Sequence, residues 1–163
     1  MSKPEQVEKK ETYAETTQYK ILDWYLDIGR SMARAGALLD YVFQTNRMDF
    51  EALRLLYEEL TTAKNDLVWF PHTLLTKEDI VKVVGYPQAL EEARQRKNRR
   101  PVAQDIDEEK RRYLQSRLDL QDEYLALALQ MDSIRKIMAA NKWFDLTKRP
   151  EPRKHDIDLR YKK

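Results

Sequence analysis

The chain has 163 residues, 42% of them hydrophobic and 36% charged, a length that suits one domain. Three glycines are too few for a turn-rich β-sandwich or barrel, and the lack of cysteine excludes disulfides, thiolate nucleophiles, iron–sulfur clusters and cysteine-containing zinc fingers. Lys and Arg number 30 against 28 Asp and Glu, so a net charge of +2 gives no overall field that would attract nucleic acid or a membrane.

The first residues predict a flexible segment over 1–16, because lysines and glutamates alternate there without an apolar core. This composition fits neither a secretory signal nor a transit peptide. No window approaches 18 uncharged apolar residues, so we expect no membrane span and, by default, a location inside the cell, in the cytoplasm.

The first long helix is predicted by an apolar repeat between residues 21 and 42. Steps of four and three residues give a 3.5-residue period over three heptads, which is typical of a coiled-coil-like seam. The seam consists of Ile21, Tyr25, Ile28, Met32, Ala35, Leu39 and Val42. We therefore expect these side chains to be buried against another helix.

Small residues form a second stripe on the same helix. Gly29, Ala33 and Ala37 recur every four residues, and Gly36 lies beside them. Small side chains let two helices approach closely. The stripe predicts a close helix contact that leucine at position 33 would overpack.

The second long helix is predicted to begin after Asp49, a favourable N-cap, and to be stopped by Pro71. Its apolar positions again step by three and four, at Phe50, Leu53, Leu56, Leu60, Ala63, Leu67 and Phe70. The short break at 45–47 predicts that the first two helices form an antiparallel αα-hairpin.

Two short helices are predicted in the connection that follows. Thr76 and Asp79 resemble a capping box that opens a helix through Val84, with Gly85 just past its end. Pro87 suits the first turn of a second short helix, which runs into the basic residues before residue 101.

The third long helix is predicted to start near Asp105 or Asp107 and to end at Asn141 in left-handed geometry. Its seam reads Tyr113, Arg117, Leu120, Tyr124, Leu127, Met131, Ile134 and Met138. Because this helix is longer than the second, part of its seam is expected to lack cover within the chain.

The positions of the tryptophans in the folded protein depend on how the three long helices are arranged. In an up-down-up bundle, Trp24 and Trp69 would meet at one end. The third helix would run parallel to the first, so Trp143 would lie at the opposite end.

The residues that usually carry out catalysis or bind metals are not arranged for it. No histidine stands three or four residues from another, and no Glu-x-x-His motif occurs. His72 has no evident orienting partner, and carboxylate pairs such as Asp23 and Asp27 fit a solvated helix face. The three glycines stand too far apart for a phosphate loop. We expect neither enzyme activity nor a cofactor.

Positive charge is concentrated in two islands. Residues 94–100 carry +5 and residues 147–163 carry +4, whereas residues 1–93 and 101–146 have net charges of −5 and −2. Such islands bind phosphates or an acidic protein, and an exposed Trp-Phe pair beside the second island would anchor a partner. The candidate docking residues are Arg94, Arg96, Lys97, Arg99, Arg100, Trp143, Phe144, Lys148, Arg149, Arg153 and Lys154.

The charges of residues 94–100 are expected to be solvated in the free chain. The nearest acidic cluster, residues 105–109, faces the start of the next helix in this interpretation. Replacing the cations by glutamine would then leave thermal stability almost unchanged.

These patterns together predict an all-α protein with three long helices and two short ones in a single domain over 17–146, followed by an extended basic tail over 147–163. The expected function is that of a non-catalytic helical subunit of a larger intracellular assembly, which contacts other protein subunits through its long-helix seams and charged termini. The alternative is a small helical subunit of a nucleoprotein complex, which contacts RNA or DNA phosphates through residues 94–100 and the tail.

Overall fold

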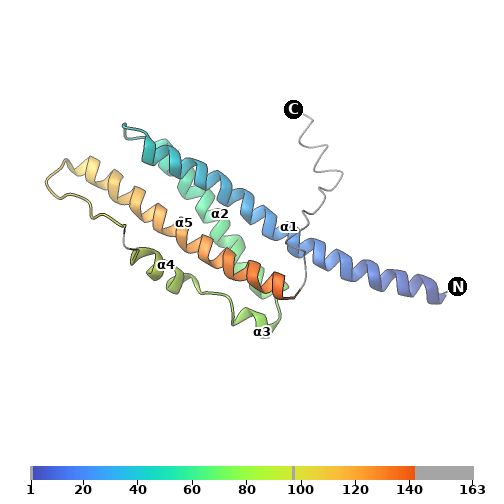
Figure 1. Ribbon diagram of the computed structural model, residues 1–163. Helices are drawn as coiled ribbons and strands as arrows, with labels where there is room; N and C mark the ends of the chain where they lie inside the picture. Colours follow the sequence, from blue (N-terminus) through green and yellow to red (C-terminus); the bar gives the residue numbers. More distant parts are fainter. Residues whose placement is uncertain (1, 97, 142–163) are drawn as a thin grey trace, which may run out of the picture.

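The computed structural model describes residues 2–96 and 98–141, and all regular secondary structure in these ranges is helical. The helices are α1 (Ser2–Gln44), α2 (Phe50–Leu74), α3 (Lys77–Ile80), α4 (Tyr86–Arg94) and α5 (Glu108–Ala140). The long helices α1, α2 and α5 pack along one another, and α4 lies beside α5 (Figure 1). The prediction of an all-α fold is confirmed.

Side-chain caps explain where three of the helices begin. Asp49 accepts a hydrogen bond from the backbone N–H of Ala52 at 3.0 Å, just before α2. Thr76 caps α3 by accepting from the backbone N–H of Asp79 at 3.2 Å. Asp107 caps α5. Each cap satisfies a backbone donor that has no partner within its helix.

Several helix ends differ from the prediction. Pro71 does not stop α2, which ends at Leu74, because a missing N–H near the end of a helix removes only one of its last hydrogen bonds. Helix α3 ends at Ile80, and Gly85 is the N-cap of α4. Asn141 has a φ of −84°, so the predicted left-handed end of α5 is wrong.

The apolar faces of α1 and α2 form most of the core. Six of the seven seam residues of α1 are buried, and Tyr25 is half-buried. The rings of Trp24 and Phe70 pack edge to face at 6.2 Å, and Arg34 Nε lies 2.9 Å from Glu59 Oε1. These contacts place the first core residues of α1 beside the end of α2.

Helix α5 runs in the direction opposite to α1. The Phe50 and Tyr113 rings lie 5.3 Å apart near the start of α5, where Arg117 also donates to the carbonyl of Val42 at 3.3 Å. Further along α5, Tyr124 faces Gly36. The three long helices therefore do not form the up-down-up bundle in which Trp143 would lie at the end opposite Trp24. Residues 75–107 lead the chain back along the bundle before α5 begins (Figure 1).

The seam of α5 is covered within the chain. Tyr113, Leu120, Leu127, Ile134 and Met138 are all buried. Helices α1 and α2 pack on α5, and α4 covers a further side of it. The expected uncovered strip on this seam is therefore wrong.

The small-residue stripe of α1 is divided between two environments. Ala33 and Ala37 are exposed, so the predicted close contact at these residues is wrong. Gly36 instead faces α5, where an added Cβ would lie 3.0 Å from the hydroxyl oxygen of Tyr124. The close approach depends on Gly36 because the Tyr124 ring occupies the space of a side chain.

Replacing Gly36 by leucine is expected to destabilise the protein by about 1–3 kcal/mol, because the larger side chain overpacks the α1–α5 contact. Leucine at the exposed Ala33 is the matched control, and its effect should stay within about 0.5 kcal/mol. Chemical unfolding of both variants measures the difference. Equal losses of stability in the two variants would show that the contact with Tyr124 does not limit the size of the side chain at position 36.

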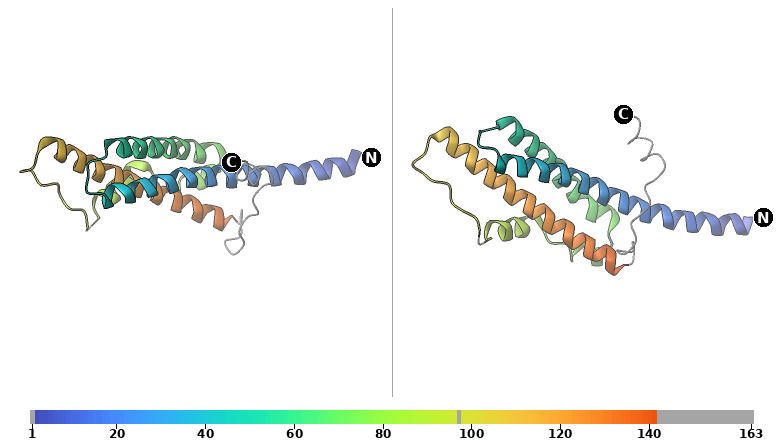
Figure 2. Two further views of the ribbon diagram at one scale, coloured as in Figure 1. Left: turned by 90° about the horizontal axis from the view of Figure 1, so that it is seen from above. Right: turned by 45° about the horizontal axis from the view of Figure 1, so that its top comes forward.

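Helix α1 continues beyond the rest of the bundle. It contains 43 residues against 25 in α2, a difference of about 27 Å at 1.5 Å per residue. Both views in Figure 2 show its first part extending past the other helices. The helix includes residues 2–16, which the sequence placed in a flexible segment, so no helix end marks the predicted boundary at residue 17.

Candidate functional site

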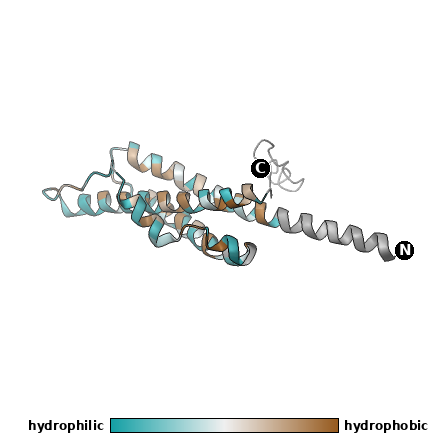
Figure 3. Cartoon of the chain, turned by 60° about the horizontal axis from the view of Figure 1, so that its bottom comes forward, coloured by the Kyte–Doolittle hydropathy of each residue, from teal (hydrophilic) through white to brown (hydrophobic). Residues whose placement is uncertain are grey.

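The first basic island, residues 94–100, connects α4 with the segment that leads to α5. Arg94 and Arg100 are exposed, whereas the side chains of Arg96 and Arg99 are only 25% and 26% exposed. Lys97 lies outside the described residues. The stretch that leads into α5 and the first turns of that helix are hydrophilic (Figure 3). The described cations of this island therefore have two different environments.

Asp122 on α5 faces Arg96 and Arg99. Its side chain is 1% exposed, and its two carboxylate oxygens each lie 3.3 Å from an Nη2 atom, one of Arg96 and one of Arg99. Arg99 also lies 3.7 Å from Asp119. The expectation that the whole island is solvated is thus wrong for Arg96 and Arg99.

The electrostatics of Asp122 reflect both burial and its two cations. Burial raises the pKa of the Asp122 carboxyl, while the charges of Arg99 and Arg96 lower it without cancelling that increase. Neither carboxylate oxygen accepts a hydrogen bond from a described residue, so the attraction to the guanidinium groups is Coulombic. A buried carboxylate requires such compensation. The ion pairs tie Arg96 and Arg99 to α5.

Close packing of α4 on α5 brings these charges together. Ala89 and Ala93 of α4 form a buried cluster with Ala126 of α5. Asp122 stands four residues before Ala126, on the same side of the helix. That spacing is the signal that could have identified Asp122, provided that the α4-facing side of α5 had been known.

A second polar cluster joins α2, α4 and α5. The Tyr86 hydroxyl donates to Glu123 at 2.8 Å, and Lys64 Nζ lies 4.0 Å from the centre of the Tyr86 ring. Burial, followed by the hydrogen bond to Glu123, raises the pKa of Tyr86. These groups satisfy one another, which is typical of a structural contact.

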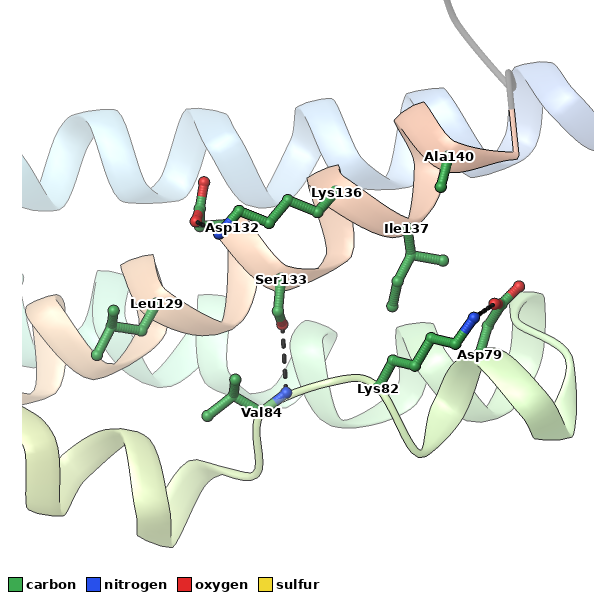
Figure 4. Close-up of a pocket in the computed structure, with 9 residues that line it drawn as sticks. All are labelled: Asp79, Lys82, Val84, Leu129, Asp132, Ser133, Lys136, Ile137 and Ala140. Atoms are coloured by element: carbon green, nitrogen blue, oxygen red, sulfur yellow. Dashed lines mark hydrogen bonds and ion pairs between the residues drawn. The ribbon is translucent and has the colours of Figure 1, made fainter.

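A cavity of about 420 Å³ lies between α5 and residues 79–84 (Figure 4). Its charged and polar groups are engaged with one another. Ser133 accepts a hydrogen bond from the backbone N–H of Val84 at 3.3 Å, and Lys82 lies 3.5 Å from Asp79. Lys136 pairs with Asp132 at 3.2 Å. The arrangement connects α3 to α5 and leaves no charged lining residue without an ion partner.

The exposed side of α2 carries large hydrophobic side chains that the sequence analysis did not single out as a surface. We call it the outer face of α2, and it consists of Phe50, Leu55, Tyr57, Val68 and Trp69, which are 40–63% exposed. Phe50 belongs to the predicted seam but remains 47% exposed. The other four lie off that seam.

The remaining candidate residues fall outside the described part of the chain, and the structure does not place them. They are Trp143, Phe144, Lys148, Arg149, Arg153 and Lys154. The tail over 147–163 lies outside it as well.

Among the described residues, His, Cys, Asp and Glu side chains form no group of three or more that could hold a metal ion. No described helix combines the length and apolar character that crossing a membrane requires. The chain matches no protein-family model, and no curated protein or solved structure is detectably similar to it.

Proposed function

We propose that the protein is a non-catalytic helical subunit of a larger intracellular assembly, and that the outer face of α2 docks on a helix of another protein subunit. One observation carries this proposal. Of the ten large hydrophobic residues that are exposed in the described part of the chain, five lie on α2. Exposed large apolar side chains that are concentrated on one helix favour an interaction site.

The outer face has the geometry of a helix-binding surface. Tyr57 and Val68 are eleven positions apart, close to three helical turns, and so form one row with Phe50. Leu55 and Trp69 form a second row, about 100–140° further round the helix. The two rows span about 28 Å of helix. An amphipathic partner helix recognises apolar positions at such intervals.

Polar residues lie between these rows. Arg54 forms ion pairs with Glu51 and Glu58 within α2. Such exposed pairs contribute little to stability, but they keep the surface between the apolar rows solvated until a partner docks.

The long helices provide the framework for this surface. In our proposal, α1 and α2 form the hairpin and α5 the third member of a bundle with coiled-coil-like seams. Because the α5 seam is buried within the chain, docking uses the outer face of α2 instead of that seam.

A second candidate function is phosphate binding in a nucleoprotein complex. It is supported by the exposed Arg94 and Arg100, whose charges remain accessible to a polyanion. It is weakened by Asp122, which already faces Arg96 and Arg99.

The proposal is tested with the double variant Tyr57→Glu/Trp69→Glu in the full chain. We expect the variant to fold, because both side chains are exposed, and to lose its protein partners, because two charges would be buried at the interface. Affinity purification from the native source, with quantitative mass spectrometry, measures the loss. Circular dichroism melting checks the fold.

Leu26→Glu/Val81→Glu is the matched control, since it places the same charges on two exposed apolar residues outside α2. The control should retain the partners. If both double variants retain them equally, the outer face of α2 is not the docking surface. Light scattering of the purified chain shows whether the partner is a second copy.

A further inference from the structure

A groove of about 440 Å³ lies between α5 and a segment formed by Arg96 and residues 98–103, with Phe43 of α1 on its wall. Three arginines line it, Arg96, Arg100 and Arg117, and no carboxylate does. Apolar side chains such as Val102 and Leu118 form the rest of the wall, together with two amides. A cavity of this size, apolar with a few converging polar groups, is typical of small-molecule sites.

Two buried N–H groups of this lining have no partner. The Nε atoms of Arg96 and Arg117 are both inaccessible to solvent and make no hydrogen bond with any described residue. Buried donors are almost always satisfied, and those that are not call for a bound water, ion or ligand. They mark Arg96 and Arg117 as side chains whose hydrogen-bonding capacity is not used up by the described part of the chain.

The two guanidinium groups are held in place by other contacts. Arg117 donates to the Val42 carbonyl at 3.3 Å and stacks over the Phe43 ring at 4.4 Å. Arg96 is positioned by Asp122 and Gln121. Fixed donors lose little side-chain entropy when they bind a ligand.

The local charge favours an anion. Positive groups outnumber negative ones around the groove and the ion pairs beside it. Four guanidinium groups lie there, those of Arg96, Arg99, Arg100 and Arg117, and two carboxylates, those of Asp119 and Asp122. The positive charge around the groove favours an anion such as a phosphate monoester, which carries close to two negative charges at neutral pH. Arginine forks fit phosphate oxygens in a bidentate manner.

We propose that this groove binds a small organic phosphate monoester. The phosphate contacts Arg117, Arg96 and Arg100, and the organic part lies against Phe43 and Val102. The proposal is independent of the outer face of α2, which lies on another helix and does not contribute to this lining.

Phenyl phosphate is the probe, titrated into the full chain by isothermal calorimetry. We expect saturable binding of one equivalent. Arg100→Gln and Arg117→Lys should each weaken it about ten-fold, because each removes guanidinium donors from the anion. Arg94→Gln removes the same charge from an exposed residue that does not line the groove, and it should change affinity less than about two-fold.

Circular dichroism melting accompanies each variant. If Arg117→Lys fails to fold, Arg100→Gln alone decides, because Arg100 is exposed and forms no ion pair in the described part of the chain. Absence of saturable binding at about 1 mM phenyl phosphate would overturn the proposal. So would an equal loss with Arg94→Gln, which would indicate unspecific charge attraction.

Oligonucleotides distinguish a terminal monoester from a nucleic-acid backbone. A 5′-phosphorylated strand that competes with phenyl phosphate, while the unphosphorylated strand does not, supports the proposal. Equal competition by both strands would contradict it and favour contacts with backbone phosphates.

Discussion

Replacing Leu39 by aspartate is expected to abolish cooperative unfolding of the protein. Leu39 is 7% exposed in the seam of α1 and belongs to the main core. An ionised carboxylate without a partner at that position costs about 4 kcal/mol or more. A domain is stabilised by only about 5–15 kcal/mol in total. Thermal unfolding followed by circular dichroism measures the effect.

Ala37→Asp is the control for Leu39→Asp, because Ala37 is an exposed residue of the same helix. It introduces the same carboxylate and lowers helix propensity by about 0.7 kcal/mol or less. Its melting curve should stay close to that of the wild type. A wild-type melting curve for Leu39→Asp would show that this face of α1 is not buried.

The double variant Arg96→Gln/Arg99→Gln is expected to lose about 3 kcal/mol of stability. It leaves Asp122, which is 1% exposed, without either of its cations. Removing one side of a buried ion pair costs about 3–5 kcal/mol, and the partial exposure of both arginines favours the lower value. The melting temperature should fall by about 10 °C.

Arg94→Gln/Arg100→Gln is the matched control, since it removes two charges from exposed residues of the same island. Its stability should change by less than about 1 kcal/mol. Equal stability of the two double variants would mean that Asp122 does not depend on Arg96 and Arg99.

The stability lost in the Arg96→Gln/Arg99→Gln variant should also depend on pH, because the carboxyl group of Asp122 titrates. Because burial raises the pKa of this carboxyl in the folded protein, the folded state binds its proton more tightly than the unfolded state. The contribution of Asp122 to stability therefore decreases as pH rises from the unfolded pKa through the raised folded pKa. Without Arg99 and Arg96, which lower the pKa, this decrease extends to higher pH.

Denaturant unfolding between about pH 4 and 8 measures this dependence, with Asp122→Asn as the reference that cannot titrate. Relative to that reference, the Arg96→Gln/Arg99→Gln variant should regain stability as pH falls. A loss that is constant over this range would exclude Asp122 as its cause.

Local patterns were sufficient to predict the helices. The 3.5-residue repeat identified the buried residues of α1, such as Ile28 and Val42, because helical periodicity alone decides which side chains share a face. Asp49 was predicted as an N-cap for a similar reason, since an N-cap depends on residues within one turn. The start of α5 was predicted near Asp105 or Asp107, and Asp107 caps it.

The candidate site was predicted only in part. The charge of residues 94–100 is evident from composition, but the different environments of Arg94 and Arg96 are not. That difference depends on Asp122, which is 26 positions from Arg96 in the chain. The same limitation applies to the groove, because Phe43, Val102 and Arg117 come from three separate segments.

The amino-acid sequence alone thus established the helical class, the starts of α2, α3 and α5 and the apolar face of α1, because each depends on neighbours within a few residues. The direction of α5, the burial of its seam, the partner of Gly36 and the ion pairs of Asp122 emerged only from the folded chain. A periodic pattern shows which face of a helix is apolar, but not which element covers it. The connection between α2 and α5 could have led the third helix back in either direction, and only the folded chain shows which one it takes, with α4 packed on α5.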